Sequence, residues 1–595
     1  MAEITKYGVV WKNGLSDLHI ELHAFRDGTE KYGGDKNNRP YHFKRIVSYY
    51  WGKGSKKPFV WNPWNEKMLH ALCNNMRCAF CGSASSGKTY LMALWGVVNW
   101  LADPLNTLVL FTSTSLEDSR RRIWGDVEGF IMAAQDEKAG KVVPARILSS
   151  VGKVRTRDGG VTYPDKCGLQ LIPGDRAKEK ENIGKIIGAK NKRVFLMGDE
   201  FPELSPALTE AAEGNLMSNP HFQMVVSGNF KGLYDPFGQF VEPLAGWGSV
   251  TPEHDEWDIK GGVALHFDGR RSPNVIEGFD KYPGLYGMTQ LENHKKLGEN
   301  TATFWRMCVS FPCSEGEAGK IYSDADLLKG DVKNNVVRWK DTPTNVAALD
   351  PAFATGGDKA MSYYGKLGMS IENKMVLLIT ERKELREDIR KKDENKSVQV
   401  AKRFRDECLR RDIKPEHAGY DISGGGVVFA GLLQEIWPDK NGSKLLGVQF
   451  GGAASDRITS GTERRPAHDV YQNRVAEIWY AGLDYIQSGQ IKGLPLDACV
   501  EMTERRIKDQ EKRAQGLKVK IETKGEMKSR TGGKSPDDAD CFFILLELCR
   551  QRLNFIAVGM EGKRALVNLD KGRRLKLVNR IYANNTHERD FADAA

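Results

Sequence analysis

The chain has 595 residues, a net charge of +10, 40% hydrophobic residues and 28% charged residues. This length is too great for one hydrophobic core, so we expect about two to four domains. The composition is that of an ordinary globular protein, and no apolar run reaches the roughly 18 residues of a membrane span, so we expect no membrane partner. The N-terminus lacks the apolar stretch of a signal peptide, and the ten cysteines are scattered, which predicts reduced thiols in an unsecreted protein.

Residues 82–89 are the most informative stretch, because they fit the phosphate-loop pattern G-x-x-x-x-G-K-[ST] in full. The apolar run at 77–81 predicts a strand, and residues 90–95 predict a helix, which is the context that the pattern requires. We expect the loop's N–H groups and the helix N-terminus to bind the phosphates of ATP. Lys88 would reach the β- and γ-phosphates, and the Thr89 hydroxyl would ligate Mg²⁺. An ordinary Gly/Ser-rich turn is the alternative. The predicted contacts are Gly82, Ser83, Ala84, Ser85, Ser86, Gly87, Lys88 and Thr89.

A second element of an ATPase site follows at residues 193–200. Four apolar residues predict a buried parallel strand, and Asp199 and Glu200 stand at its C-terminal end. In an open α/β sheet, ligands bind at the carboxyl ends of the strands. Asp199 would hold Mg²⁺, and Glu200 would orient and deprotonate the attacking water. A strand that ends in Asp-Glu is weak support alone, but downstream of a phosphate loop it predicts ATP hydrolysis.

Further segments fit the same parallel sheet. Residues 106–111 and 221–226 are apolar and predict strands. The second strand leads into a Ser-Gly-Asn tip, and we expect Asn229 at this tip to sense the γ-phosphate. Residues 58–65 offer aromatic rings and the amide of Asn65, which suit stacking on and hydrogen bonding to adenine. Packing in a core accounts for these rings equally well.

The character of the chain changes after residue 315. Two predicted strands, at 345–350 and 417–421, each end in an aspartate, and an apolar helix later opens with three more. Strand-end aspartates together with acids on a helix suit a two-metal phosphodiester hydrolase, because carboxylate oxygens bind Mg²⁺ or Mn²⁺. Each aspartate alone could equally belong to a turn or a helix cap. The predicted metal-binding and catalytic acids are Asp350, Asp421, Asp537 and Asp540. The sequence leaves open which of Asp537, Asp538 and Asp540 binds metal.

A basic segment precedes the last acids. Residues 501–534 hold 11 Lys and Arg against 6 Asp and Glu. From charge alone, a solvated face and a nucleic-acid contact are equally good interpretations.

Taken together, these motifs resemble the large terminase subunit of tailed bacteriophages, an ATP-driven DNA-packaging motor. The resemblance spans residues 58–550 and rests on the order of the motifs: phosphate loop, Asp-Glu strand, Ser-Gly-Asn tip, a link at 311–322 and a three-acid nuclease. It implies an α/β fold with an N-terminal P-loop ATPase domain of the ASCE type, built on a mostly parallel sheet, and an RNase H-like nuclease domain. The implied parts are an arm or extra lobe (1–57), the ATPase domain (58–310), a linker (311–340), the nuclease domain (341–550) and a basic tail (551–595).

The family implies what the chain would do and with what. ATP hydrolysis would drive double-stranded viral DNA through the portal of an empty procapsid, and the nuclease would cut concatemeric DNA. The implied partners are the portal protein, a small terminase subunit and further copies of this chain, commonly in a pentamer. The implied location of the chain is the host cell cytoplasm, and it would not be part of the mature virion. Two other classes stay open. An ATP-dependent helicase–nuclease would need a second motor lobe, and none is visible before residue 340. A DNA- and portal-binding scaffold with an inactive nuclease fits poorly with the full set of acids.

The resemblance also assigns further residues and shows a departure. Many relatives carry an arginine inside the phosphate loop, where this chain has Ala84 and Ser85. The candidates for a replacement, in cis or from a neighbouring subunit, are Arg120, Arg121 and Arg122. Asn65 stands where relatives have the longer Gln. In the basic segment, the residues that would hold the DNA backbone by charge are Lys518, Lys520, Lys524, Lys528, Arg530 and Lys534.

Overall fold

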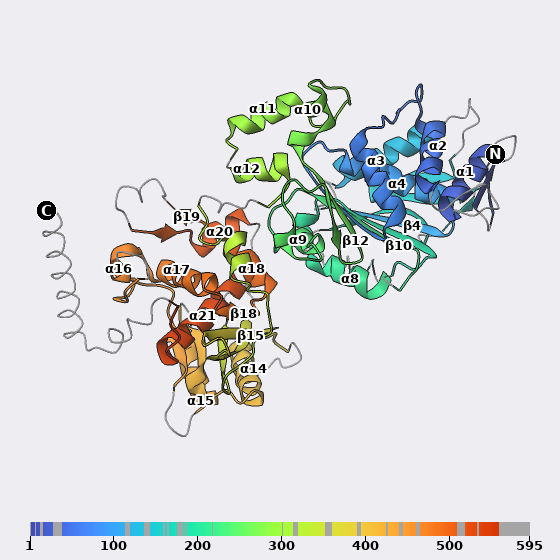
Figure 1. The fold of residues 1–595 in the computed structure, drawn as a ribbon. Coiled ribbons are helices and arrows are strands. Elements are labelled where there is room, and N and C mark those ends of the chain that lie inside the picture. Colours follow the sequence, from blue (N-terminus) through green and yellow to red (C-terminus); the bar gives the residue numbers. More distant parts are fainter. Residues whose placement is uncertain are drawn as a thin grey trace, which may run out of the picture. The chain divides into compact units, whose positions relative to one another are not determined.

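The chain forms two compact units, residues 1–315 and 316–595, in a computed structural model (Figure 1). The structure describes residues 2–5, 8–11, 16–27, 38–113, 119–135, 143–158, 161–163, 166–174, 183–184, 186, 188–216, 218–299, 301–312, 319–351, 360–388, 394–423, 426–438, 444–459, 465–508, 518–531 and 535–558. Lys534, the side chain of Arg121 and all but the start of the predicted basic tail lie outside this description. No helix within these ranges is long and apolar enough to cross a membrane.

The first unit is built on a ten-stranded sheet with the order β11-β12-β3-β10-β9-β4-β8-β6-β5, and β7 pairs with β6. The six strands from β12 to β8 run parallel, whereas β11, β6 and β5 add antiparallel edges. The predicted mostly parallel sheet is therefore confirmed. Its strands are β3 (Arg77–Gly82), β4 (Thr107–Ser113), β5 (Ala145–Leu148), β6 (Lys153–Asp158), β7 (Val161–Thr162), β8 (Gly168–Pro173), β9 (Arg193–Gly198), β10 (Phe222–Gly228), β11 (Glu256–Ile259) and β12 (Gly262–Phe267).

Helix α4 (Lys88–Ala102) is the centre of the first unit's core. Nearly all of its residues are buried, as expected for a helix that is apolar on every side. It packs with α1 (Ser16–Asp27), α2 (Arg39–Trp51), α3 (Pro63–Asn74) and α6 (Gly125–Ala134) on one side of the sheet, while α8 (Pro206–Leu216) and α9 (Pro236–Phe240) lie on the other (Figure 1). Phe25, Phe43 and Trp51 belong to this same core. Within the segment that we predicted as an arm or extra lobe, helices α1 and α2 are thus packed onto the first unit.

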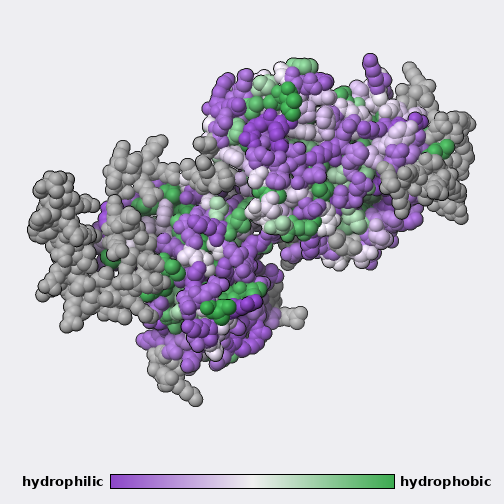
Figure 2. Space-filling model, viewed as in Figure 1, coloured by the Kyte–Doolittle hydropathy of each residue, from purple (hydrophilic) through white to green (hydrophobic). Residues whose placement is uncertain are grey.

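A second group of short helices follows the sheet. It comprises α10 (Pro273–Glu277), α11 (Met288–Lys296), α12 (Ala302–Phe304) and a π-helical turn, Trp305–Val309. Most of the visible surface is hydrophilic, with small apolar areas in between (Figure 2). Ile276, Phe279 and Leu297 of this helical segment are among the exposed apolar side chains.

The second unit contains a six-stranded sheet with the order β17-β16-β13-β14-β15-β18. Strands β13, β14 and β15 pair antiparallel. Strands β16 and β17 then add in parallel beside β13, which is an RNase H-like arrangement. The strands are β13 (Thr344–Asp350), β14 (Met361–Met369), β15 (Met375–Glu384), β16 (Ala418–Asp421), β17 (Leu446–Val448) and β18 (Ile491–Lys492). A separate two-stranded hairpin joins β19 (Ile507–Lys508) and β20 (Lys520–Ile521).

Helices cover both faces of this sheet. One face packs on α14 (Lys396–Arg410) and α15 (Gly426–Ile436), and the other on α21 (Asp537–Arg552). The remaining helices are α13 (Asp324–Lys329), α16 (Ala467–Val470), α17 (Arg474–Gln487), α18 (Leu496–Glu504) and α20 (Lys524–Arg530). Residues 319–340, which we predicted as part of a linker, pack in this unit, where Gln487 Nε2 donates to Asp326 Oδ1 at 2.8 Å.

The alternation of side chains along two neighbouring strands decides where the acids lie. Ala347 and Leu349 of β13 face the core with α14 and α15, so Asp350 faces the side of α21. Likewise, Ala418 and Tyr420 of β16 face that core, which directs Asp421 toward α21. Both strand-end aspartates therefore point to the face on which the acid-bearing helix is packed.

Candidate ATPase and nuclease sites

The phosphate loop joins β3 to α4 and is held in a tight turn. Gly87 has a φ of +80°, a conformation that favours glycine, and a Cβ at Gly82 would meet Ser86 Oγ at 2.7 Å. Lys88 Nζ donates to the carbonyl oxygens of Gly82 at 2.8 Å and Ser83 at 2.9 Å, and to Ser86 Oγ at 2.8 Å. Burial lowers the pKa of Lys88 to about 8, against Asp199 and Glu200, which raise it. The ammonium group therefore lies inside the loop that phosphates would enter.

Three polar side chains from three elements meet at the carboxyl edge of the sheet. The Thr89 hydroxyl lies 3.1 Å from both carboxylate oxygens of Asp199, and the Ser227 hydroxyl donates to Asp199 Oδ1 at 2.6 Å. Asp199 is 4% exposed. These are hard oxygen donors of the kind that Mg²⁺ prefers when phosphates complete its shell. The structure thus brings together the predicted residues Thr89 and Asp199, and it adds Ser227 to them.

Glu200 follows Asp199 in a left-handed backbone conformation with a φ of +51°. Arg122, from a π-helical turn at Arg120–Trp124, contacts the Glu200 carboxylate, and half of the Arg122 side chain is exposed. Arg120 instead donates to the carbonyl oxygen of Ser150 at 2.5 Å. Of the two candidate arginines whose side chains are described, only Arg122 therefore faces the catalytic edge.

The helical segment after β12 holds the phosphate loop from the outside, which the sequence did not indicate. Three of the contacts are backbone hydrogen bonds: Ser83 N–H donates to the carbonyl of Phe267, the last residue of β12, at 2.9 Å, Ala84 N–H to the Met307 carbonyl at 3.1 Å, and Tyr286 N–H to the Ser85 carbonyl at 2.9 Å. Gln290 Nε2 of α11 also donates to Ser85 Oγ at 3.2 Å. Ala84 and Ser85 are thus in contact with this segment.

Asn229 and Arg306 also make contacts near the phosphate loop and Glu200. Asn229 Nδ2 donates to the carbonyl oxygen of Arg306 at 3.3 Å, so the Ser-Gly-Asn tip touches the same segment. The Arg306 guanidinium lies 3.5 Å from Glu203, three residues after Glu200. Arg306 was missed by sequence reasoning because no motif surrounds it.

A cavity of about 430 Å³ lies beside the end of β12, and its lining includes Trp64, Phe267, Tyr282 and Ile276 together with charged side chains such as Lys67 and Arg271. The rings of Trp64 and Phe267 lie 5.4 Å apart, and Phe267 is the residue whose carbonyl binds Ser83. This volume and lining suit a ligand of nucleobase size. Asn65 is buried in the first turn of α3, where its amide oxygen accepts from Asn62 N–H at 2.9 Å and its amide nitrogen donates to the Val60 carbonyl at 3.2 Å. Its contact with adenine stays a prediction.

Three buried hydroxyls without partners lie near the loop. Ser83 Oγ, Thr112 Oγ1 and Ser113 Oγ have no hydrogen-bond partner among the described residues. All three lie in the loop or at the end of β4, at the carboxyl edge of the parallel strands. A buried hydroxyl without a partner is costly, so these atoms fit a polar ligand such as a nucleotide phosphate.

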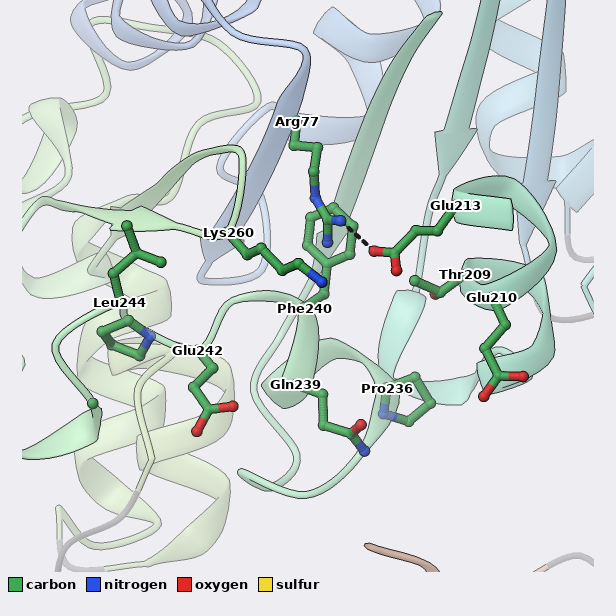
Figure 3. A pocket seen from close by; sticks show the side chains of 12 residues that line it. Arg77, Thr209, Glu210, Glu213, Pro236, Gln239, Phe240, Glu242, Leu244 and Lys260 are labelled. Carbon is green, nitrogen blue, oxygen red and sulfur yellow. Dashed lines mark hydrogen bonds and ion pairs between the residues drawn. The ribbon is translucent and has the colours of Figure 1, made fainter. Parts of the chain in front are cut away.

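Another cavity, of about 500 Å³, lies at the opposite end of β3 (Figure 3). Arg77 opens β3, stacks 4.3 Å from the ring centre of Phe240 and contacts Glu213, and Lys260 points toward the same hollow (Figure 3). Because it lies at the amino ends of the parallel strands, this cavity is not the nucleotide site.

In the second unit, the predicted acids converge on one face of the sheet. Asp350, Asp421, Asp537 and Asp540 are each less than a tenth exposed. Burial raises the pKa of Asp350 well above its ordinary value, and the charges of Asp540, Asp537 and Asp421 add to this rise. Asp421 Oδ1 accepts from Ser423 N–H at 2.7 Å, and burial raises its pKa as well. The mutual repulsion shows that the four carboxylates share one environment.

Lys524, the first residue of α20, is inserted among these acids. Its Nζ lies 2.6 Å from Asp540 Oδ2 and 4.0 Å from Asp350 Oδ2. Although burial disfavours its charge, Asp540 and Asp350 raise the pKa of Lys524 above its ordinary value. Among the other predicted DNA contacts, Arg530 pairs with Glu522 at 2.6 Å, Lys518 is exposed and Lys528 is half-buried. Lys524 thus faces the acids, and DNA binding by this segment stays a prediction.

Asp538 turns away from the other acids of α21. Its carboxylate accepts from Arg382 Nε at 2.6 Å, from Arg382 Nη2 at 2.8 Å and from the Tyr363 hydroxyl at 2.9 Å. On a helix, positions 537 and 540 share a face, whereas 538 is rotated off it. Helical periodicity could therefore have separated Asp538 from Asp537 and Asp540.

Glu501 of α18 is a half-buried acid that sequence reasoning missed. Its Oε2 accepts from the Ala539 N–H at 2.8 Å, in the first turn of α21. Burial, followed by the charge of Asp538, raises the pKa of Glu501 well above its ordinary value. Glu501 therefore fixes the start of the acid-bearing helix.

The oxygens of this acid cluster suit hard divalent ions. Asp350 Oδ2 is a buried oxygen without a hydrogen-bond donor in the described part of the chain. No three His, Cys, Asp or Glu side chains among the described residues are placed to hold a single ion. The fit to Mg²⁺ or Mn²⁺ rests on the carboxylate donors alone, and in this arrangement Lys524 lies between Asp350 and Asp540.

The chain was compared with known proteins. No protein-family model matches it, and no curated protein does. Among solved structures, the nuclease domain of the large terminase subunit of bacterial virus Sf6 is 20% identical, over 38% of this chain and 98% of that chain, with a TM-score of 0.29. The large terminase of a thermophilic bacteriophage in complex with ADP is 14% identical, over 84% and 98%, with a TM-score of 0.30. The Thermus phage P74-26 large terminase ATPase domain is 13% identical, over 45% and 96%, with a TM-score of 0.32.

The structural neighbours are thus large terminase subunits of several phages, and they include both ATPase and nuclease domains. Identities of 13% to 20% and TM-scores of 0.29 to 0.32 do not support a particular activity. The activity therefore has to follow from the residues of the two sites.

Proposed function

We propose that this chain is the large subunit of a viral DNA-packaging motor, in which an ATPase and a metal-dependent endonuclease share one polypeptide. The observation that carries this proposal is the joint arrangement of Lys88, Thr89 and Asp199 around a phosphate loop, in the same chain as four converging acids. Two such sites in one chain suit a machine that both moves and cuts DNA.

In the ATPase unit, each residue has a distinct task. Lys88 and the loop amides bind the β- and γ-phosphates, Thr89 and Asp199 hold Mg²⁺, and Asn229 lies at the γ-phosphate. Glu200 takes the proton of the attacking water, and Arg122 offsets the charge that develops. The Mg²⁺ that Thr89 and Asp199 would hold would supply neutralisation of phosphate charge. The base enters the cavity beside Trp64, near Asn65.

In the nuclease unit, Asp350, Asp421, Asp537 and Asp540 would hold two divalent ions, which would supply activation of water and stabilisation of the leaving oxygen. Asp538 and Glu501 hold α21 so that its acids face the strand ends. The duplex is held by the basic residues of the β20–α20 segment, which contact its backbone without reading sequence. The portal, a small terminase subunit and a ring of further copies are the partners that this function requires.

Two matched variants test the proposal. Lys88→Ala should abolish ATP hydrolysis and spare Mn²⁺-dependent cutting of plasmid DNA, while Asp350→Ala should do the reverse. Lys295→Ala, an exposed change on α11, serves as the control for both assays. ATPase activity that persists in Lys88→Ala would remove the assigned site.

A second assay separates the motor from its rivals. Purified protein is given procapsids and DNA, separately and together, and ATP hydrolysis is measured. Strong stimulation only by both supports packaging, whereas strand separation by DNA and ATP alone would indicate a helicase–nuclease. Absence of hydrolysis and of Mn²⁺ binding would indicate a scaffold.

A further inference from the structure

His266 of β12 is a buried histidine whose two ring nitrogens both face backbone carbonyl oxygens. Its Nδ1 lies 2.9 Å from the carbonyl oxygen of His254, and its Nε2 lies 2.7 Å from the carbonyl oxygen of Val309. The side chain is 2% exposed, and the rings of Trp257 and Phe311 pack against it. The imidazole therefore bridges two segments that are distant in the sequence.

The protonation state of the ring decides how many of these contacts are hydrogen bonds. Neutral imidazole has one N–H, so it can donate to one carbonyl and turns a lone pair toward the other. Imidazolium has two N–H groups and can donate to both. Only the protonated ring therefore joins His254 and Val309 by two hydrogen bonds at once.

His266 itself and the Val309 end of this bridge lie beside residues that bind the phosphate loop. Phe267, the next residue along β12, accepts the hydrogen bond of Ser83 N–H at 2.9 Å. Val309 ends the π-helical turn that contains Met307, whose carbonyl accepts from Ala84 N–H at 3.1 Å. His266 thus lies where the two segments that carry the outer side of the loop meet.

We propose that His266 is a positioning residue for the phosphate loop, and that its imidazolium form holds the loop in its nucleotide-binding arrangement. The inference rests on the proposed ATPase function, because it gives that site a dependence on protons. If bound nucleotide favours the loop arrangement that imidazolium holds, then nucleotide and proton bind cooperatively. Nucleotide affinity then falls as the pH rises through the titration of His266.

The surroundings of His266 place this titration on the acid side. Burial lowers its pKa from the ordinary value, while the two carbonyls and the charge of Asp268 oppose that change and Arg271 adds to it. Asp255 and Lys67 line the cavity that His266 also borders. Burial lowers the pKa of Lys88 only to about 8, which is above the range of this titration. His254 and His294 are the other imidazoles near the loop segment.

The test measures the dissociation constant of a fluorescent ADP analogue on the full chain between about pH 5 and 7. Wild type is compared with His266→Gln, which keeps one donor and does not titrate, and with His254→Gln and His294→Gln as matched controls. The analogue's own titration is common to all four proteins. We expect wild type and both controls to lose affinity about three- to tenfold toward pH 7, since a tenfold change corresponds to one unit of pKa shift by the nucleotide.

In His266→Gln we expect this slope to disappear, with affinity near the wild-type value at pH 7. A slope that persists in His266→Gln overturns the inference, and so does a loss of affinity by one factor at every pH, which would indicate packing alone. If His266→Gln does not fold, His266→Asn replaces it in the same series. Lys88→Ala separates the two proposals: unchanged nucleotide binding there contradicts the ATPase site itself, whereas lost binding with a flat wild-type profile contradicts only the role of His266.

Discussion

The Thr89 hydroxyl and the Asp199 carboxylate lie 3.1 Å apart, although 110 residues separate them in the chain. Parallel pairing sets this distance, because β3, β10, β9 and β4 are neighbours whose carboxyl ends form one edge. The contact places a neutral hydroxyl and a buried carboxylate where a divalent ion and phosphates would meet.

The negative charge of Asp199 should be required for ATP hydrolysis, and its shape alone should not suffice. Asp199→Asn keeps the side-chain volume and a hydrogen bond to Thr89 but removes the carboxylate that holds Mg²⁺. We expect ATP hydrolysis to fall about 100-fold or more, and the gain in nucleotide affinity on adding Mg²⁺ to vanish. Steady-state hydrolysis and nucleotide titrations with and without Mg²⁺ measure this. As a control, Asp126→Asn on α6 removes an ion pair with Lys57 and should leave the hydrolysis rate and the effect of Mg²⁺ on nucleotide affinity unchanged.

Arg122 and Arg120 should differ sharply although they lie in the same turn. Arg122 contacts Glu200, whereas Arg120 binds the Ser150 carbonyl. Removing a cation that stabilises transition-state charge lowers kcat about 10²- to 10³-fold or more. We therefore expect Arg122→Ala to lower kcat by this factor and to change nucleotide affinity little. Arg120→Ala should change kcat less than about threefold. Equal effects of the two variants would contradict the assignment.

The strands and the loop could be predicted from sequence because their signals are local. Four-residue apolar runs followed by polar tips located β3, β4, β9 and β10, and the glycine pattern located the turn between β3 and α4. In the second unit, runs that end in aspartate located β13 and β16. Period-two alternation then accounts for why Asp350 and Asp421 face one side.

What could not be predicted depends on contacts between distant segments. The hydrogen bonds of Tyr286 and Met307 to the loop use backbone groups, which every residue carries, so no side-chain pattern marks them. The resemblance predicts that Lys524 holds the DNA backbone, which stays a prediction, whereas its place among the acids follows from how α20 packs. Charge alone does not say which face a lysine occupies.

Replacing Asp540 should impair DNA cutting, whereas replacing Asp538 should lower the stability of the fold. Asp540→Asn should abolish Mn²⁺-dependent plasmid cutting, since Asp540 faces Lys524 and Asp350. Asp538→Asn should instead weaken the charged hydrogen bonds to Arg382 and lower the stability by about 2 kcal/mol, or about 4–8 °C in melting temperature. Plasmid nicking and thermal unfolding of both proteins measure this. A stable, inactive Asp538→Asn would place that acid in the metal site instead.

Glu547 should make the second unit sensitive to acid. This fully buried carboxylate in α21 binds Arg474 at 2.7 Å and Arg457 at 3.2 Å, and it contacts Arg550. Burial would raise its pKa, but the three arginines outweigh burial and lower it to about 2, against an ordinary value of 4.5. Because the folded pKa is the lower one, the charge contributes about 3 kcal/mol of stability above pH 4.5, which is lost as the pH falls toward 2.

Replacing Glu547 tests this dependence directly. Glu547→Gln leaves the arginines without their shared anion, so we expect a loss of about 3–5 kcal/mol at pH 7 and a flatter stability profile below pH 4.5. Urea unfolding between pH 3 and 7 measures both quantities, with Glu372→Gln, at an exposed turn, as the control. Equal acid sensitivity in Glu547→Gln and wild type would show that other carboxylates govern it. A variant as stable as wild type at pH 7 would show that the arginines are satisfied without Glu547, since the loss arises only if their charges are left buried and unpaired.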